Sequence, residues 1–353
     1  MDIKKFVRPN IRSLSAYKAN EILCKVKLDA NESPYGLIPA LRKQFLHVFT
    51  RIEPNRYPDS EARELKAILA KLAGVSRGNI LIGNGSDELL YYLIITFGGP
   101  ILYPIPTFSM YSIIAQALGE RKIEIPLCKD FDIDLEKTLS AIKAQRPKLV
   151  FLSSPNNPTG NCFSSEKILR IVRESPGLVV VDEAYLPFSS SAGFLPRLKK
   201  QGNLIVLKTI SKIGFAGLRI GYLIANKEII SEVNKVRLPF NLNSLSQVAA
   251  IAALQHKDVI DRQIAMIKKQ RGLLYNNLNT IIGIKPFPSE ANFILFKVDN
   301  ADRVYKELLY RGILIRNMNG ALENYLRVTV GTPEENKLFL KAMKEVMNEN
   351  SKG

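Results

Sequence analysis

Residues 148–182, KLVFLSSPNNPTGNCFSSEKILRIVRESPGLVVVD, decide the fold of this chain. Two continuous apolar runs, at 148–153 and 177–182, flank a segment at 164–174 with the periodicity of an amphipathic helix. Strands that are apolar on both faces are typical of a parallel sheet that helices cover on both sides. The stretch therefore predicts a strand–helix–strand unit of an α/β fold.

The same alternation of strands and helices extends over most of the chain. We expect further strands at 24–28, 100–103, 122–125, 203–207 and 219–225, and further helices at 61–73, 87–97, 107–118, 134–144 and 193–200. After about residue 226 the pattern changes to a helical stretch at 244–279, with a candidate break at 257–258, then strands at 291–298, 313–316 and 325–330 and helices at 301–311 and 333–348. The pattern predicts a large domain with a mostly parallel sheet sandwiched by helices, and a smaller α+β domain at the C-terminal end.

The length of 353 residues favours two domains, at roughly 100–200 residues per domain. We predict an N-terminal arm at 1–35 that packs with the small domain, a large domain at 36–240 and a small domain at 241–353. The sequence contains no internal repeat and no low-complexity linker.

The charge of the chain is strongly positive, with 50 Lys and Arg against 33 Asp and Glu, which gives +17. Such a balance suits anionic partners, among them a phosphorylated small molecule. No basic cluster is interleaved with aromatic residues, which argues against nucleic acid. The apolar stretches are too short for a membrane span, and the N-terminus lacks the apolar segment of a signal peptide. We therefore expect a cytoplasmic protein that binds neither nucleic acid nor membrane.

Cysteine and histidine are scarce, with three Cys and two His. The cysteines are scattered and form no Cys-x-x-Cys pair, and neither histidine has a partner at ligand spacing. We therefore expect no metal site, no disulfide framework and no Ser-His-Asp triad.

The motif GNGSDE at 83–88 directly precedes a helical pattern. Its glycines allow a tight turn, and the N–H groups at the start of the helix form an anion site for which phosphate is a natural guest. The alternative is a plain turn in which Ser86 or Asp87 caps the helix. The motif is neither a dinucleotide fingerprint nor a P-loop, because Glu88 occupies the third glycine position and no Gly-Lys-Ser/Thr follows.

Polar residues follow two of the apolar strands. The loop SSPNNPTG at 153–160 stands where α/β folds bind ligands, at the carboxyl end of a strand, and its prolines restrain it more than a simple turn requires. Asp182 ends the next strand, where a carboxylate is poorly solvated and needs a cationic partner, unless it only caps the following segment. The phenol of Tyr185 is near enough in sequence to reach the same site.

Lys212 follows the strand predicted at 203–207. A lysine there can act as a Schiff-base nucleophile if its surroundings lower its pKa. Arg219 comes seven residues later, after a glycine-bearing stretch, and its guanidinium can hold a phosphate through two hydrogen bonds. In a chain so rich in lysine, the alternative for Lys212 is an ordinary surface position.

Together these motifs form the set of groups that pyridoxal phosphate requires. The glycine-rich cup and Arg219 bind the phosphate, and Lys212 bonds to the aldehyde. Asp182 keeps the pyridine nitrogen protonated, so that the ring accepts electrons from the substrate carbon. Phenol and amide groups bind the ring oxygen.

On these residues the chain resembles the fold-type-I pyridoxal-phosphate aminotransferases, in the class that includes the histidinol-phosphate aminotransferases. The motifs that carry the resemblance span nearly the whole length: LDANESP at 28–34, RYPD at 56–59, GNGSDE at 83–88, PTFSMY at 106–111, SPNNPTG at 154–160, VVDEAY at 180–185, TISK at 209–212, GLRIG at 217–221, ANF at 291–293 and LRVTVG at 326–331. SPNNPTG with the later SK and GLR elements is specific for the superfamily. LDANESP, RYPD and ANF favour the histidinol-phosphate branch.

The resemblance implies the roles of the catalytic residues. Lys212 bonds to the cofactor and moves the proton, Asp182 pairs with the ring nitrogen, and Asn157 and Tyr185 contact the ring oxygen.

The resemblance also implies the remaining binding residues. They are Gly85, Ser86, Asp87, Ser211 and Arg219 at the cofactor phosphate, with Thr209 beside them; Phe108 stacked on the ring, where the family usually carries tyrosine; Tyr57 reaching the cofactor of the neighbouring subunit of a homodimer; and Asn31, Arg316 and Arg327 at the substrate.

The activity that the resemblance implies is ping-pong amino transfer between L-histidinol phosphate or imidazole acetol phosphate and 2-oxoglutarate or glutamate, in histidine biosynthesis. Threonine-phosphate decarboxylase and aromatic amino-acid aminotransferase are alternatives on the same fold. A remote alternative is a regulator that binds the cofactor without catalysis. Residues 1–35 are too short for a helix-turn-helix unit and Lys212 is present, which argues against a regulator.

Overall fold

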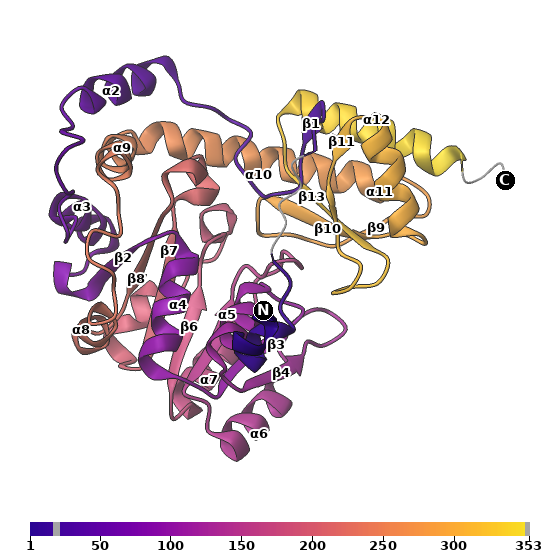
Figure 1. Ribbon diagram of the computed structural model, residues 1–353. Helices are drawn as coiled ribbons and strands as arrows, with labels where there is room; N and C mark the ends of the chain where they lie inside the picture. Colours follow the sequence, from indigo (N-terminus) through magenta and orange to yellow (C-terminus); the bar gives the residue numbers. More distant parts are fainter. Residues whose placement is uncertain (17–21, 350–353) are drawn as a thin grey trace.

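A seven-stranded sheet forms the centre of the computed structural model, which describes residues 1–16 and 22–349 (Figure 1). Its strand order is β2-β8-β7-β6-β5-β3-β4. The strands are β2 (Ile80–Asn84), β3 (Ile101–Ile105), β4 (Lys122–Pro126), β5 (Leu149–Ser153), β6 (Leu178–Asp182), β7 (Leu204–Thr209) and β8 (Ile220–Ile224). β8 is antiparallel to both of its neighbours, and the other pairs are parallel. The predicted mostly parallel sheet is therefore confirmed.

Helices cover both faces of this sheet, because its central strands are apolar on both sides. Val179 and Val181 of β6 belong to one apolar core, and Val180 belongs to the other. The first core also contains α3 (Arg63–Ala73), α6 (Leu135–Gln145), α7 (Ser165–Glu174) and α9 (Ser244–Gln255); the second contains α4 (Ser86–Phe97), α5 (Met110–Leu118) and α8 (Lys227–Asn234). Side chains alternate along a strand, so Asp182 lies on the same face as Val180, toward α5.

A smaller four-stranded antiparallel sheet lies toward the C-terminal end (Figure 1). Its order is β12-β13-β10-β9, from β9 (Lys285–Pro286), β10 (Phe293–Lys297), β12 (Arg316–Asn317) and β13 (Tyr325–Thr329). It shares a core with α10 (Lys257–Asn279), α11 (Ala301–Tyr310) and α12 (Pro333–Glu349). Beside it, β1 (Val26–Lys27) pairs in parallel with β11 (Ile313–Leu314).

The helical stretch predicted at 244–279 divides at His256 into α9 and α10. α9 packs on α3 and on α2 (Pro39–Phe49), so its buried alanines belong to the core of the large sheet. Farther along, Ile267 and Leu274 of α10 belong to the core of the small sheet. The domain boundary at residue 240 stays a prediction, and this packing favours a division within α10.

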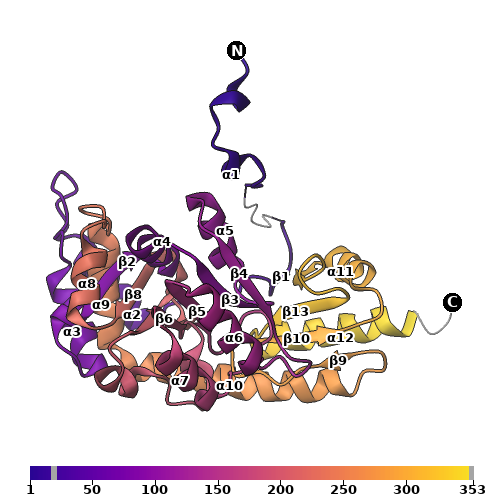
Figure 2. The same cartoon turned by 90° about the horizontal axis from the view of Figure 1, so that it is seen from below.

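The beginning of the chain lies against the large sheet's helices, which differs from the predicted packing of the whole arm 1–35 with the small domain. Asn10 donates hydrogen bonds to the carbonyls of Gln116 and Ala117, at 2.8 and 2.9 Å. Both carbonyls belong to the last turn of α5; that of Gln116 also accepts the N–H of Gly119 at 3.0 Å, and Asn10 supplies a donor to that of Ala117. Figure 2 shows the N-terminus projecting beyond α5. Residues 17–21 of the arm and 350–353 of the predicted small domain lie outside the described residues.

Several elements differ from the sequence prediction. α1 (Pro9–Arg12), α2, α8, β2 and β9 were not expected, and the helix predicted at 193–200 is a 3₁₀ turn at Leu195–Lys200. Pro196 removes a backbone donor there, and Gly193 before it adopts a left-handed φ of 69°. β2 overlaps the glycine motif at Gly83 and Asn84, which masks its strand pattern. Within the described residues, no helix is both long enough and apolar enough to span a membrane.

Candidate active site

One pocket lies at the carboxyl ends of β5, β6 and β7 and the start of α4. Twelve residues line it: Ser86, Asp87, Phe108, Ser153, Asn157, Asp182, Ala184, Tyr185, Thr209, Ser211, Lys212 and Arg219. All of them except Ser153 and Ala184 are residues that the sequence predicts for the site. The structure thus brings together motifs that lie more than 130 residues apart in the chain, because parallel strands end at the same edge of the sheet.

The start of α4 forms an anion cup with Arg219, and two glycines make the close approach feasible. Gly85 has φ of 88°, and a Cβ on it would lie 2.5 Å from a guanidinium nitrogen of Arg219. A Cβ on Gly221 would lie 2.5 Å from the backbone nitrogen of Ser86. Asp87 is 3.5 Å from the Arg219 guanidinium. The N–H groups of the first helical turn and the guanidinium together suit a phosphate.

The carboxylate of Asp182 is buried at the end of β6. One oxygen accepts the N–H of Ala184 at 3.0 Å, and the other accepts the hydroxyl of Tyr111 at 2.8 Å. Burial raises the pKa of Asp182 to about 6 in spite of these two hydrogen bonds. A cationic N–H group placed against the carboxylate would stabilise its ionised form.

Lys212 lies in a 3₁₀ turn, Ser211–Ile213, directly after β7. Its ammonium nitrogen is 5.7 Å from the centroid of the Tyr185 ring. The Tyr185 hydroxyl accepts a hydrogen bond from the side chain of Asn31 at 3.0 Å, and its ring packs edge-on against Phe293. Asn31 therefore reaches the pocket through Tyr185 and does not line it.

Thr209, at the end of β7, stabilises the turn that carries Lys212. The Thr209 hydroxyl donates to the carbonyl of Ile220 at 2.9 Å, and it accepts the N–H of Ser211 at 3.1 Å. Ser211 is thereby fixed beside the anion cup, with its hydroxyl 2.9 Å from that of Thr209.

Two arginines of the small sheet lie side by side near the pocket, although neither lines it. Arg316 of β12 is directly opposite Arg327 of β13, so both side chains are on the same face. The Arg327 guanidinium donates to the side-chain oxygen of Asn157 and to the carbonyl of Asp29, and it lies over the Phe293 ring. Arg327 therefore connects the small sheet to the loop after β5.

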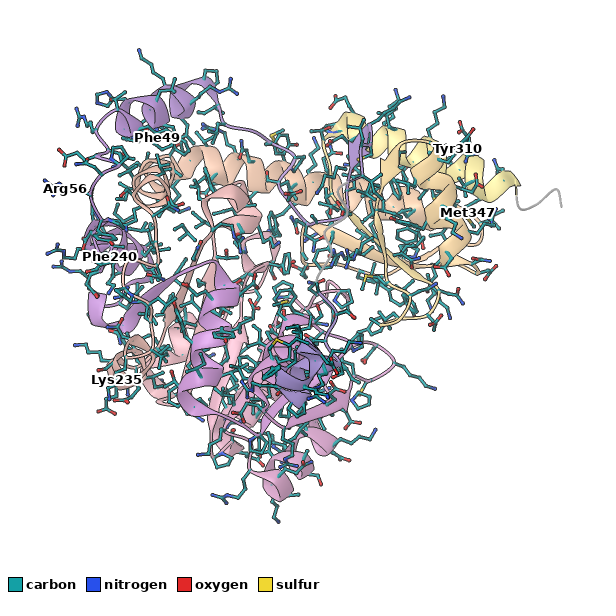
Figure 3. The ribbon with its side chains drawn as sticks, viewed as in Figure 1. Phe49, Arg56, Lys235, Phe240, Tyr310 and Met347 are labelled. Carbon is teal, nitrogen blue, oxygen red and sulfur yellow. The ribbon has the colours of Figure 1, made fainter. Side chains whose placement is uncertain are left out.

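Tyr57 does not reach the pocket of its own chain. Its side chain is 82% exposed and stacks on Phe240, with ring centroids 4.5 Å apart and an interplanar angle of 19°. The predicted contact of Tyr57 with a neighbouring subunit's cofactor stays a prediction. Figure 3 places Arg56, the residue before it, and Phe240 at the same outer edge of the large sheet's domain.

Sequence analysis assigns no role to Tyr111, whose hydroxyl donates to Asp182. A signal existed: Tyr111 follows Phe108 by three residues, which places the two on one side of a helical turn. Their rings meet edge to face, 5.7 Å apart. Ser153 and Ala184 were not predicted either. Ser153 is the last residue of β5, and Ala184 follows the end of β6 by two residues, so both lie at strand ends that form the site.

The donor set fits pyridoxal phosphate. The pocket offers an anion cup, a buried carboxylate and a strand-end lysine within one cavity, which match the phosphate, ring nitrogen and aldehyde of that cofactor. Among residues 1–16 and 22–349, no group of three or more His, Cys, Asp or Glu is placed to hold a metal ion.

Comparison with known proteins points to the same chemistry. The sequence matches the family model "Aminotransferase class I and II" over residues 24–343. The "Histidinol-phosphate aminotransferase 2" of Nitrosococcus oceani is 43% identical over 351 residues, and the match covers 97% of both chains. The resemblance drawn from the motifs is therefore confirmed.

Solved structures share the fold over nearly the whole chain. The histidinol-phosphate aminotransferase of Sinorhizobium meliloti in complex with pyridoxal-5'-phosphate has a TM-score of 0.88 at 27% identity and covers 98% of both chains. The L-threonine-O-3-phosphate decarboxylase of Porphyromonas gingivalis has a TM-score of 0.81 at 27% identity, covering 92% of this chain and 99% of that one.

The raised pKa of Asp182 predicts an unusual pH dependence of stability. The folded protein binds this proton more tightly than the unfolded chain, so the unfolding free energy of the cofactor-free protein should fall as the pH rises from about 4 to about 6, then stay level. A shift of about two pKa units corresponds to about 3 kcal/mol. Asp182→Asn should lose this decline in urea unfolding between these pH values.

Asp134→Asn is the matched control for this measurement. Asp134 is a half-buried N-cap whose hydrogen bond with Lys137 lowers its pKa, so it does not titrate in the same window. This variant should keep the decline between pH 4 and 6. A decline of equal size in Asp182→Asn would show that another group causes it.

Proposed function

This chain belongs to the class I and II aminotransferase family, and on that basis we propose that it transfers an amino group between L-histidinol phosphate and 2-oxoglutarate. The observation that carries the proposal is the joint placement of Lys212, Asp182 and the anion cup in one pocket, with two arginines beside it. The 43% identity to a histidinol-phosphate aminotransferase over nearly both entire chains supports this choice of substrate. The reaction belongs to histidine biosynthesis, and we propose a cytoplasmic location.

Pyridoxal phosphate is the proposed cofactor. When bound, it carries the amino group between the two substrates and withdraws electrons from the substrate Cα. The first turn of α4, Ser211 and Arg219 would hold its phosphate, and Asp182 would hold its ring nitrogen. Phe108 would cover one face of the ring, and Asn157 and Tyr185 would supply an amide and a phenol to the ring oxygen.

Lys212 is the proposed acid–base group of the reaction. Its amine would take the proton from the substrate Cα and deliver it to the carbon that receives the amino group, and it would act in the reverse order in the second half-reaction. The lysine lies on a turn fixed by Thr209, and it approaches the ring of Tyr185. The hydrogen bonds of Thr209 would thus keep the Lys212 amine in position both when it removes the proton and when it delivers it.

Arg316 and Arg327 are the proposed substrate-binding cations. The site must accept carboxylates of glutamate in one half-reaction and a phosphate in the other. Guanidinium groups bind both kinds of anion through paired hydrogen bonds. Arg327 is buried, and its position is fixed by Asn157 and Asp29, which suits a carboxylate bound close to the pocket.

A homodimer is the proposed assembly. The stacked rings of Tyr57 and Phe240 are exposed. Large apolar side chains of α4, of the segment after α8 and of the start of α9 are exposed as well, namely Tyr91, Ile95, Leu238 and Leu245. A second copy of the chain would remove this apolar surface from water. Tyr57 would then reach the partner's cofactor phosphate.

The alternative function is decarboxylation of a phosphorylated amino acid. The structural likeness to the Porphyromonas gingivalis decarboxylase, at 27% identity, supports this alternative. Two assays separate the proposals: amino transfer from glutamate to imidazole acetol phosphate, and release of carbon dioxide from threonine phosphate. Carbon dioxide release without amino transfer would overturn the proposed function. The other alternative, an aromatic amino-acid aminotransferase, is tested by using aromatic 2-oxo acids as acceptors in the first assay.

Lys212→Ala should abolish amino transfer and leave the protein folded. The variant should also lose the borohydride-reducible link to the cofactor, which mass spectrometry detects. Lys199→Ala, at an exposed lysine, should behave like the wild type in both respects. Full activity of Lys212→Ala would refute the assignment of this lysine.

Arg316→Ala and Arg327→Ala should differ in the half-reaction that they impair. We expect Arg327→Ala to slow the glutamate half-reaction more, and Arg316→Ala to slow the half-reaction with L-histidinol phosphate more. Loss of a hydrogen bond between charged groups costs about 1.5–3 kcal/mol, roughly 10- to 150-fold in rate. Single-turnover rates measure each half-reaction, and equal losses in both variants would contradict the division.

Mixed dimers test whether Tyr57 acts across the subunit boundary. Inactive Lys212→Ala subunits are mixed with subunits disabled by a substitution of Tyr57, and exchange is allowed. If Tyr57 serves the partner's site, each mixed dimer contains one site with both defects and one intact site, so activity returns. If it serves its own site, every site keeps one defect and no activity is regained. A monomer at working concentration would also contradict the proposed assembly.

A further inference from the structure

Tyr111 contacts the carboxylate that the proposed cofactor needs, yet it does not line the pocket. Its hydroxyl donates to one oxygen of Asp182 at 2.8 Å, and its side chain is completely buried. The pocket is lined by Asp182 itself. The hydroxyl of Tyr111 therefore acts on the reaction through Asp182.

Three aromatic side chains hold the ring of Tyr111 in place. Phe151 of β5 stacks on it, with centroids 5.0 Å apart and planes 12° apart. Phe108 meets its edge at 90°, and Tyr103 of β3 lies tilted at 6.2 Å. A ring packed in this way cannot turn its hydroxyl away from Asp182 without displacing its neighbours. The same ring contacts the residue proposed to cover the cofactor.

The hydroxyl of Tyr111 remains a donor throughout the working pH range. Burial raises the pKa of Tyr111 well above its ordinary value, and the adjacent Asp182 raises it further. The hydroxyl therefore keeps its proton, and its hydrogen bond always favours the ionised carboxylate. Asp182 has only one other hydrogen-bond donor in the described structure, the N–H of Ala184 on its other oxygen.

Some of the charges around Asp182 favour its ionised form, and others disfavour it. Asp87 of α4 and the neighbouring Glu183 disfavour a negative charge at Asp182. Glu183 is paired with Lys208 at 2.6 Å, and Lys212 and Arg219 line the same pocket as Asp182. Against burial and two carboxylates, the Tyr111 hydroxyl is the side-chain hydrogen bond that lowers the pKa of Asp182.

We propose that Tyr111 is a positioning residue, which keeps the Asp182 carboxylate ionised and oriented toward the nitrogen of the cofactor ring. Its effect on the reaction rests on the proposed function, because that effect requires pyridoxal phosphate. Its effect on Asp182 does not, because the hydrogen bond is present in the protein alone.

A pH-dependent defect distinguishes this role from a purely structural one. Without the Tyr111 hydroxyl, Asp182 should take up a proton at a higher pH than in the wild type. A protonated carboxyl no longer stabilises a cationic ring nitrogen. Tyr111→Phe should therefore lose activity on the acid side of the profile and recover it as the pH rises, whereas a packing defect would lower the rate at every pH.

The first experiment uses the cofactor-free protein and needs no enzyme activity. The pKa of the Asp182 carboxyl is followed by carbon-13 NMR with labelled aspartate, and Asp182→Asn assigns the signal. Tyr111→Phe should raise this pKa by roughly one to two pH units, since a hydrogen bond to a charged group contributes about 1.5–3 kcal/mol and one unit corresponds to about 1.4 kcal/mol.

Tyr103→Phe is the matched control. Tyr103 is also buried and packs against Tyr111, but its hydroxyl donates to Glu124 at 2.6 Å. This variant loses a buried hydroxyl near the site without loss of a bond to Asp182, so it should leave the pKa of Asp182 unchanged. A shift of equal size in both variants would overturn the proposal.

The second experiment uses the protein loaded with pyridoxal phosphate. The single-turnover rate with glutamate is measured against pH for the wild type, Tyr111→Phe and Tyr103→Phe. The acid limb of Tyr111→Phe should move upward by the same one to two units, roughly, with a rate within about twofold of the wild type at high pH. A loss that is uniform with pH would overturn the proposal.

A second substitution tests the opposite direction and does not depend on whether Tyr111→Phe folds. Incorporation of 3-fluorotyrosine at residue 111 makes the phenol a stronger donor, so it should lower the pKa of Asp182. An unchanged or raised pKa would overturn the proposal. If the wild type transfers no amino group, the proposed function fails, while the NMR titration still decides the role of Tyr111.

Discussion

The carboxylate of Asp182 ends a strand that is apolar on both faces, so it loses its hydration when the chain folds. An ion in that place needs donors from the protein, and α5 supplies one through Tyr111 while the turn after β6 supplies another through Ala184. These contacts fix how α5 sits on the sheet and where the pocket opens. The pKa of about 6 shows that they only partly offset the burial. The site is thus built to receive a cation, and the proposed cofactor would bring one.

The anion cup at the other end of the pocket depends on the close approach of the β8 backbone to the start of α4, as well as on charge. β8 passes so near the start of α4 that a side chain on Gly221 would strike the amide of Ser86. This contact places Arg219, directly before β8, beside the first turn of the helix. Helix dipole, amide donors and guanidinium then act on one anion. The spacing between this cup and Asp182 is set by the sheet, because both lie at strand ends.

The parts of the site that sequence could predict are those fixed by local pattern. Asp182 and Lys212 each follow an apolar strand, and the glycine motif precedes a helix, so topology brings them together. Tyr111 could not be assigned in this way, since its hydrogen bond depends on how α5 packs across β5 and β6. The contact of Asn10 with α5 was not predicted for a similar reason, since the carbonyls of Gln116 and Ala117 that it reaches have no sequence signature. The sequences of β2 and α2 show only weak strand and helix periodicity, so these two elements depend on packing against their neighbours.

Arg316 and Arg327 place two positive charges at neighbouring positions of the small sheet. Arg316 and Arg327 are cross-strand neighbours of like charge, an arrangement that destabilises a sheet by itself. Arg327 is also buried, and its guanidinium is held by Asn157 of the large sheet and by the carbonyl of Asp29. If Arg327 binds the substrate carboxylate as we propose, the orientation of its guanidinium is already fixed before binding, which reduces the entropy lost on association. Because Asn157 lines the pocket and accepts a hydrogen bond from Arg327, one amide connects the proposed substrate-binding arginines with the pocket that holds Asp182 and Lys212.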